Sequence, residues 1–288
     1  MISTIIIAVT AMAFIGVIAA IILYYVAQKF KVIEDPKIDE IAEQLPGANC
    51  GGCGFAGCRN FAETIVKSGS MEGLNCPVGG NSLRNIIGGI MGVQVTETTP
   101  QVAVVRCNGN PANAPLKVKY DGPFTCQFVH GLFAGENGCP YGCLGLGDCV
   151  QACKFDAMYM DLVTGLPVVI EEKCVACGAC VKACPRMIIE MRNKGPKGKR
   201  IFVSCVNREK GVIARKNCSV ACIGCNKCVK ICPHDAIILE NNLAYIDYDK
   251  CKLCRKCVAE CPTDAIHEVA FPVRKPTAVS NEQLAMSN

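Results

Sequence analysis

Two stretches near the end of the chain decide its fold: CIGCNKCVKICP at residues 222–233 and CKLCRKCVAECP at residues 251–262. A third stretch, CVACGACVKACP at residues 174–185, has the same spacing of four cysteines and a proline. In ferredoxins this spacing lets three thiolates of one loop bind three irons of a [4Fe–4S] cluster, while the fourth cysteine binds the neighbouring cluster. The spacing therefore predicts iron–sulfur centres built in pairs.

This cross-ligation predicts two cluster sites in the C-terminal part of the chain. One set is Cys222, Cys225, Cys228 and Cys261, and the other is Cys251, Cys254, Cys257 and Cys232. Zinc is the alternative, but a zinc site usually takes its four ligands as two separated Cys-x2-Cys pairs. Three closely spaced cysteines followed by Cys-Pro, in three copies, favour iron–sulfur clusters.

The cysteine pattern is duplicated along the chain. Residues 139–153 match residues 218–232, with Cys126 and Cys205 at the same offset, and Cys174 corresponds to Cys251 at nearly the same offset. A match of this length indicates two copies of one module rather than general cysteine richness. We therefore expect two ferredoxin-like modules, each with two clusters.

The first module departs from the pattern at one ligand, because Leu146 stands where the repeat predicts a cysteine. One complete set remains: Cys174, Cys177, Cys180 and Cys153. The other set holds Cys143, Cys149 and Cys184 and needs a fourth ligand, for which Cys139 is nearest in sequence. The cysteines left over would then form one more tetrad: Cys107, Cys126, Cys205 and Cys218. The alternative is that some of these are free buried thiols or a zinc site.

A different cysteine set precedes the modules, in LPGANCGGCGFAGC at residues 45–58 and in the Cys-Pro pair at 76–77. Its cysteines are Cys50, Cys53, Cys58 and Cys76. The surrounding glycines let the backbone approach the sulfurs and donate N–H bonds to them. We expect another [4Fe–4S] site here, with a zinc knuckle as the alternative. About six clusters, and at least five, are expected in all.

The chain begins with an unbroken apolar run, Ile5 to Val26, which is long enough to span a bilayer. Tyr24 and Tyr25 close the run and Lys29 follows, as at a membrane interface with the positive side inside. A cleaved signal peptide is the alternative, but the basic leading residues that it requires are missing. We expect a single-pass anchor with the clusters on the cytoplasmic side, where structural disulfides are not expected.

Composition narrows the function. Of the 288 residues, 24 are cysteine, 51% are hydrophobic and 19% are charged, which excludes a disordered chain. Six oxidised clusters with their thiolates would add a charge of about −12, so that the formal net charge of +5 gives no argument for nucleic-acid binding. Neither a Gly-x-Gly-x-x-Gly fingerprint nor a Walker A motif occurs. We expect no dinucleotide site and no catalytic residues, only electron transfer between clusters.

Basic residues gather between the two modules. Residues 192–216 contain Arg192, Lys194, Lys197, Lys199, Arg200, Arg208, Lys210, Arg215 and Lys216, against the single acid Glu209. Two interpretations remain open. The stretch is either a solvated connection that balances the charge of nearby clusters, or a docking patch for an acidic ferredoxin.

The anchor followed by LPGANCGGCGFAGC and ferredoxin-type runs resembles the B-subunit family of the Rnf complex over nearly the whole chain, in its longer clostridial or acetogenic form. The predicted fold is α+β: a transmembrane helix, a small 4Fe-4S domain and two duplicated bicluster ferredoxin-like modules. The predicted segments are an anchor (1–28), an N-terminal 4Fe-4S domain (29–95), a β-rich connection (96–135), a first module (136–190), a basic connection (191–217), a second module (218–267) and a flexible tail (268–288).

The resemblance implies a component of a membrane-bound, ion-translocating ferredoxin:NAD oxidoreductase. It implies electron relay from reduced ferredoxin toward other subunits of the complex, coupled to Na⁺ or H⁺ translocation at the cell membrane. The alternatives are a component of a related complex that reduces an iron–sulfur transcription regulator, or a polyferredoxin of another membrane oxidoreductase.

Overall fold

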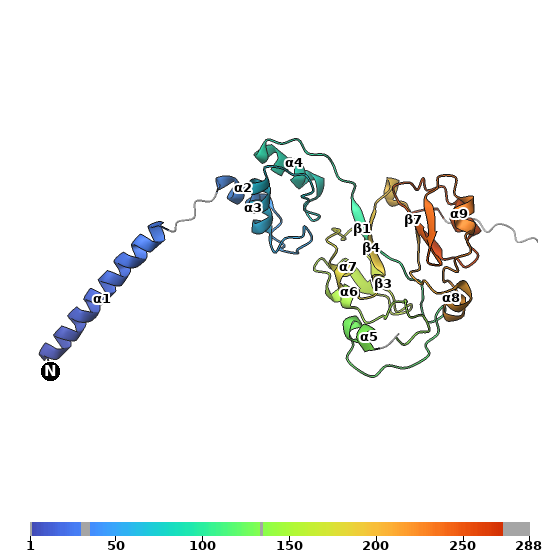
Figure 1. The fold of residues 1–288 in the computed structure, drawn as a ribbon, viewed down its shortest axis with the longest axis horizontal. Coiled ribbons are helices and arrows are strands. Elements are labelled where there is room, and N and C mark those ends of the chain that lie inside the picture. Colours follow the sequence, from blue (N-terminus) through green and yellow to red (C-terminus); the bar gives the residue numbers. More distant parts are fainter. Residues whose placement is uncertain (1, 30–34, 133–134, 273–288) are drawn as a thin grey trace, which may run out of the picture.

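The computed structural model describes residues 2–29, 35–132 and 135–272, and Figure 1 shows its main parts in order along the chain. It begins with one long helix, α1 (Ile2–Lys29), which carries no acidic residue in its first turn and ends with Lys29. Among the described residues, no helix satisfies the joint requirement of length and hydropathy for a membrane span. The anchor therefore stays a prediction, and most of the predicted tail lies outside the described residues.

A three-helix domain follows, made of α2 (Pro36–Gln44), α3 (Cys58–Ser68) and α4 (Gly80–Met91). Asp35 caps α2 by accepting the backbone N–H of Lys37 at 2.9 Å, with proline in the first helical position. The apolar faces of the helices meet in a small core that contains Ile41, Phe61 and Ile87. This core supports the loop of residues 45–57, which carries Cys50 and Cys53.

The first ferredoxin-like module is built from two antiparallel strand pairs and short helices. Its elements are β1 (Gln101–Val105), α5 (Cys126–Leu132), α6 (Asp148–Gln151), β2 (Met158–Met160), β3 (Pro167–Val169), α7 (Ala179–Ala183) and β4 (Ile189–Asn193). Strand β1 pairs with β4, and β2 pairs with β3. Residues 101–105 of the predicted connection therefore supply a strand of this module.

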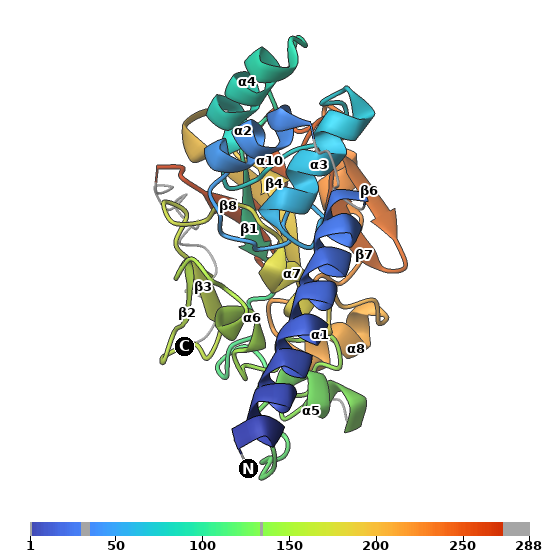
Figure 2. The same ribbon diagram turned by 90° about the vertical axis from the view of Figure 1, so that its left-hand side faces the viewer.

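The second module repeats this arrangement. Its elements are the 3₁₀ turn η1 (Pro196–Gly198), β5 (Arg200–Val203), α8 (Gly211–Asn217), α9 (Lys227–Ile231), β6 (Ile237–Glu240), β7 (Leu243–Ile246), α10 (Lys256–Glu260) and β8 (Ile266–Val269). Strand β5 pairs with β8, and β6 pairs with β7. Figure 2 shows the hairpins β2–β3 and β6–β7 on opposite flanks of the molecule.

Buried arginines join the two modules. Arg106 donates to the carbonyl oxygens of Val203 at 3.2 Å and Cys205 at 3.3 Å. Arg192 is 1% exposed and lies 5.1 Å from the ring centroid of Tyr245. Glu190 forms ion pairs with both arginines. This carboxylate of the first module is therefore the counter-charge of the two buried cations that contact the second module.

Two residues of the basic stretch, Arg192 and Arg200, fit neither a solvated connection nor a docking patch. Arg192 is packed between the modules, and Arg200 is 5% exposed and pairs with Glu171. Neither arginine is available to a docking patch, because a strand places each guanidinium in the interior. Lys197, Arg208, Lys210, Arg215 and Lys216 are exposed.

We expect the substitution Glu190→Gln to lower the free energy of unfolding by about 3 kcal/mol, because it leaves two buried guanidinium groups without a counter-charge. Denaturant unfolding of the anaerobic, cluster-loaded chain measures this change. Glu63→Gln is the matched control, since Glu63 pairs with Lys67 on an exposed helix face and we expect a change below about 0.5 kcal/mol. Equal effects of the two substitutions would contradict this role for Glu190.

Candidate metal centres

Cysteines line four cavities in groups of four. We name the cavities by their cysteines. Site B has Cys153, Cys174, Cys177 and Cys180; site C has Cys126, Cys143, Cys149 and Cys184; site D has Cys107, Cys139, Cys205 and Cys218; site E has Cys222, Cys225, Cys228 and Cys261.

The two remaining sets lie at the ends of the molecule. Site A comprises the N-terminal cysteines Cys50, Cys53, Cys58 and Cys76, of which Cys53 and Cys58 are near enough to raise the pKa of Cys76, after the larger effect of burial. Site F comprises Cys232, Cys251, Cys254 and Cys257. Burial raises the pKa of Cys257 to about 12, and the other cysteines of site F add to the rise.

The loops build sites B, E and F in the same way. The residue before the helix that carries the third cysteine adopts a left-handed backbone conformation: Gly178 before α7, Asn226 before α9 and Arg255 before α10. This conformation ends the cysteine loop and turns the chain into the helix. The helix then ends at the fourth cysteine, which extends toward the partner site. The repeat of the sequence is thus a repeat of backbone conformation.

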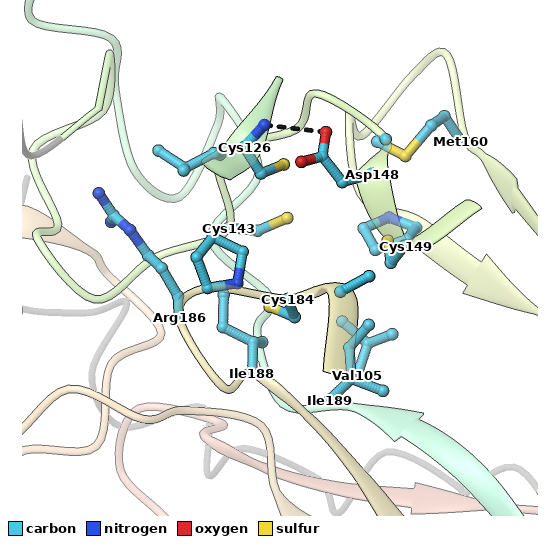
Figure 3. A pocket seen from close by; sticks show the side chains of 15 residues that line it. Val105, Cys126, Cys143, Asp148, Cys149, Met160, Cys184, Arg186, Ile188 and Ile189 are labelled. Atoms are coloured by element: carbon cyan, nitrogen blue, oxygen red, sulfur yellow. Dashed lines mark hydrogen bonds between the residues drawn. The ribbon is translucent and has the colours of Figure 1, made fainter. Parts of the chain in front are cut away.

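Site C is completed by Cys126, and not by Cys139 as the sequence suggested (Figure 3). The reason lies in Asp148, the first residue of α6, which accepts the backbone N–H groups of Cys126 at 2.8 Å and Gln127 at 3.1 Å. This carboxylate caps the first turn of α5 and holds it against α6. The thiol of Cys126 is thereby brought in from a segment far upstream in the sequence.

Cys139 belongs instead to site D, between the modules. Asn207, which is 1% exposed, donates from its side chain to the sulfur of Cys139 at 3.4 Å. Asn207 also donates to Glu209, which fixes the orientation of its amide. Asp148 and Asn207 are supporting residues that the cysteine pattern did not reveal, since no motif in the sequence marks them.

The donor sets fit [4Fe–4S] clusters. Backbone N–H groups point at sulfurs, as from Gly109 to Cys107 at 3.4 Å and from Ala157 to Cys153 at 3.4 Å. Burial raises the thiol pKa in these sites, to about 12 for Cys180, so thiolates require nearby positive charge, which iron supplies. In the described part of the chain, no three His, Cys, Asp or Glu side chains gather closely enough to hold a single metal ion.

Consecutive sites are neighbours. Any side chain at Gly52 would begin 3.0 Å from the Cα, Cβ and carbonyl oxygen of Cys177, so the loop of site A lies against site B. Burial raises the pKa of Cys180 in site B most, and the cysteines of its own loop raise it further. Cys149 of site C is close enough to contribute a smaller increase. The backbone N–H of Cys143 in site C donates to the sulfur of Cys107 in site D at 3.4 Å.

The series of neighbours continues through the second module. The backbone N–H of Cys222 in site E donates a hydrogen bond to the sulfur of Cys205 in site D. Burial raises the pKa of Cys205 to about 12. Cys228 of site E adds to the raised pKa of Cys257 in site F, again after burial. These neighbours place the sites in the order A, B, C, D, E and F, from the three-helix domain to the second module.

Arg186 lies between sites C and D. Its guanidinium donates to the carbonyl oxygens of Cys139 at 3.3 Å and Gly142 at 3.0 Å, and it interacts electrostatically with cysteines of both sites. A fixed positive charge favours an added electron at a neighbouring centre. Arg186 therefore stabilises the reduced form of any cluster held on either side of it.

The exchange of Cys126 and Cys139 gives a direct test. We expect Cys126→Ser to abolish the same electron paramagnetic resonance (EPR) signal as Cys184→Ser, because both residues line site C. Cys139→Ser should abolish the same signal as Cys205→Ser, because both line site D. Iron content should fall in each variant from about 24 to about 20 atoms per chain. Loss of the Cys184 signal in Cys139→Ser would contradict this assignment.

Family models match three of the cysteine regions. A model for an Fe-S cluster matches residues 45–78, a 4Fe-4S binding domain matches residues 167–190, and a 4Fe-4S dicluster domain matches residues 221–265. The first covers site A. The second covers three of the four cysteines of site B, all but Cys153, and the third covers sites E and F.

Curated relatives match most of the chain. It is 44% identical to the B subunit of the Na⁺-translocating ferredoxin:NAD⁺ oxidoreductase complex of Acetobacterium woodii, over 88% of this chain and 74% of that protein. It is 41% identical to the B subunit of the ion-translocating oxidoreductase complex of Methanosarcina acetivorans, over 86% of this chain and 92% of the relative. The B subunit of the proton-translocating ferredoxin:NAD⁺ oxidoreductase complex of Clostridium ljungdahlii is 38% identical over 86% of both chains.

Identity at this level over most of both chains shows common descent and a common fold, and the cysteine sets described above agree with it. The chain belongs to the B-subunit family of the Rnf-type ion-translocating oxidoreductase complexes.

Proposed function

We propose that this chain relays electrons from reduced ferredoxin, through about six [4Fe–4S] clusters, toward other subunits of an Rnf-type complex that reduce NAD and translocate Na⁺ or H⁺. The observation that carries the proposal is the series of neighbouring cysteine sites A to F. Clusters held in neighbouring sites would exchange electrons without a moving carrier. The chain is an electron-transfer subunit and converts no substrate of its own.

Each cluster would be held by the four cysteines of its site. When bound, the clusters supply one-electron chemistry, and the protein tunes it through N–H···S bonds, burial and charge. The backbone N–H groups of Gly109 and Ala157, which donate to the sulfurs of Cys107 and Cys153, would serve this purpose here. The guanidinium of Arg186 would supply the charge. The protein also excludes water, since half of the twelve cysteines in sites C, D and E are buried.

The names of the relatives favour this function over the reduction of a transcription regulator, because each describes an ion-translocating oxidoreductase complex. The partners proposed for this chain are therefore the other subunits of such a complex and a soluble ferredoxin. A freely diffusing polyferredoxin is not favoured either, since it would need no apolar segment at its N-terminus.

We also propose that α1 anchors the chain in the cell membrane, with the clusters on the cytoplasmic side. The support is the uncharged sequence from Ile5 to Val26 and the lysines that follow it. We expect alkaline carbonate to leave the full chain in the membrane fraction and to release a chain that lacks residues 1–28. Release of both chains would contradict the anchor.

Breaking the series in the middle tests the relay. Cys205→Ser removes a ligand of site D, so we expect reduced ferredoxin to reduce the clusters on one side of site D while those on the other side stay oxidised. Freeze-quench EPR resolves the two groups, and excess dithionite should then reduce all that remain. Cys58→Ser, which removes a ligand of the terminal site A, is the control and should leave the other sites reducible. If reduced ferredoxin reduces every remaining cluster of the Cys205→Ser variant as it does in the wild type, a serial relay is ruled out.

A further inference from the structure

The two modules present the same cysteine to different surroundings. Cys177 in site B and Cys254 in site F occupy the same place in CVACGACVKACP and CKLCRKCVAECP. Cys177 is partly buried, whereas Cys254 is exposed. Of the 24 cysteines, all of which the structure describes, Cys225 is the other exposed one. The two copies of the loop therefore differ in whether another part of the chain covers the second cysteine.

In the first module the three-helix domain covers this position. The backbone at Gly52 lies so close to Cys177 that an added Cβ would be 3.0 Å from three of its atoms. The residues that flank Cys177 are small and uncharged: Ala176, Gly178 and Ala179. The three-helix domain of the same chain is thus packed against site B, where the residues beside Cys177 carry no charge.

In the second module the equivalent residues are Leu253, Arg255 and Lys256. No part of the described chain buries the sulfur of Cys254. The turn at residues 195–199 lies beside this loop, since a Cβ at Gly195 would be 3.3 Å from the side chain of Leu253. This turn brings two further lysines next to the loop.

Lysines therefore lie in the loop of Cys254 and in the turn beside it. We call this set the lysine collar: Lys197, Lys199, Lys250, Lys252 and Lys256. Lys197, Lys250, Lys252 and Lys256 are exposed, and Lys199 lies 5.3 Å from the ring centroid of Phe271. Of the nearby acids, Glu268 pairs with Arg255, whereas Asp249 accepts only from the neutral amide of Asn193, at 3.2 Å, and keeps its negative charge. The five lysines of the collar outnumber this carboxylate, so the side-chain charge of the surface is positive.

The other exposed cysteine has fewer lysines beside it. The loop of Cys225 carries Lys227 and Lys230, and Lys227 pairs with Glu260 at 3.7 Å. Gly211 lies against Ile223 of this loop, which brings Lys210 near it. The larger number of lysines favours the loop of Cys254 for an acidic partner.

We infer that the lysine collar around Cys254 is the docking surface for an acidic one-electron iron–sulfur carrier protein, which takes at site F the place that the three-helix domain takes at site B. This rests on the proposed function and deepens it by assigning the surface. One electron leaves the carrier, which is oxidised, and is accepted at site F, which is reduced. No covalent bond changes.

Charge is what a transient partner requires. A carrier that must bind, transfer an electron and leave needs fast association and fast dissociation. Complementary charge raises the association rate without requiring a long-lived complex. The contact within the chain at Cys177 uses small residues and close packing instead. The two loops therefore share a ligand pattern and differ in the feature that separates an internal neighbour from a diffusing one.

The test follows the reduction of the full, cluster-loaded chain by stopped-flow after mixing with a photoreduced, acidic two-cluster ferredoxin. At low salt we expect Lys252→Glu/Lys256→Glu to lower the second-order rate constant by about tenfold or more and to flatten its salt dependence. Lys197→Glu/Lys250→Glu, outside the cysteine triplet of the loop, should act in the same direction. Iron content and EPR must show that site F is intact in both variants.

The matched control is Lys210→Glu/Lys216→Glu, which makes the same charge change at exposed positions by α8. We expect its rate constant to stay within about twofold of wild type. Reduction of wild type by ferredoxin, with collar variants no slower than the control, would overturn the docking surface and leave the relay intact. Reduction of wild type by dithionite but not by ferredoxin would overturn the proposed donor, and the surface with it.

Discussion

The structure depends on bringing four thiols together around each cavity. Like charges repel and burial opposes ionisation, as the raised pKa of Cys180, Cys205 and Cys257 shows. Short loops hold these sulfurs in place nevertheless, because left-handed residues such as Gly178 turn the chain around each site. Only positive charge within the cavity makes such an arrangement of thiolates favourable, and clusters supply it. The small hydrophobic core of each module is built largely around these cysteines.

Because each site is small, its contacts with neighbours decide the path of the electrons. The modules would be free to move apart if only a linker joined them. Arg106 and Arg192, neutralised in part by Glu190, bind β4 to the second module through buried hydrogen bonds. Site D takes its cysteines from both sides of this junction. A polar network and a shared site thus fix the spacing between the two modules, with Arg186 placing charge between sites C and D.

The two copies of the module share their ligand spacing and differ in the surface around one loop. Each copy keeps the cysteine spacing, the left-handed turn and the strand pairs β1–β4 and β5–β8. The surfaces above the equivalent loops differ, with small residues around Cys177 and basic residues around Cys254. A single scaffold can therefore contact an internal iron–sulfur domain at one end and present charge at the other.

Ligand spacing within a loop is local, so the sequence by itself predicted the cysteine sets that line the cavities of sites B and E. It also carried the family resemblance that the relatives confirm. The choice between Cys126 and Cys139 was not local, because it depends on Asp148 holding α5 against α6 and on Asn207 reaching Cys139. Burial of Arg192 and Arg200 depends likewise on strand pairing, which a count of charges does not contain. Tertiary structure alone decided these points and the order of the sites, since each rests on residues that are far apart in the sequence and adjacent in space.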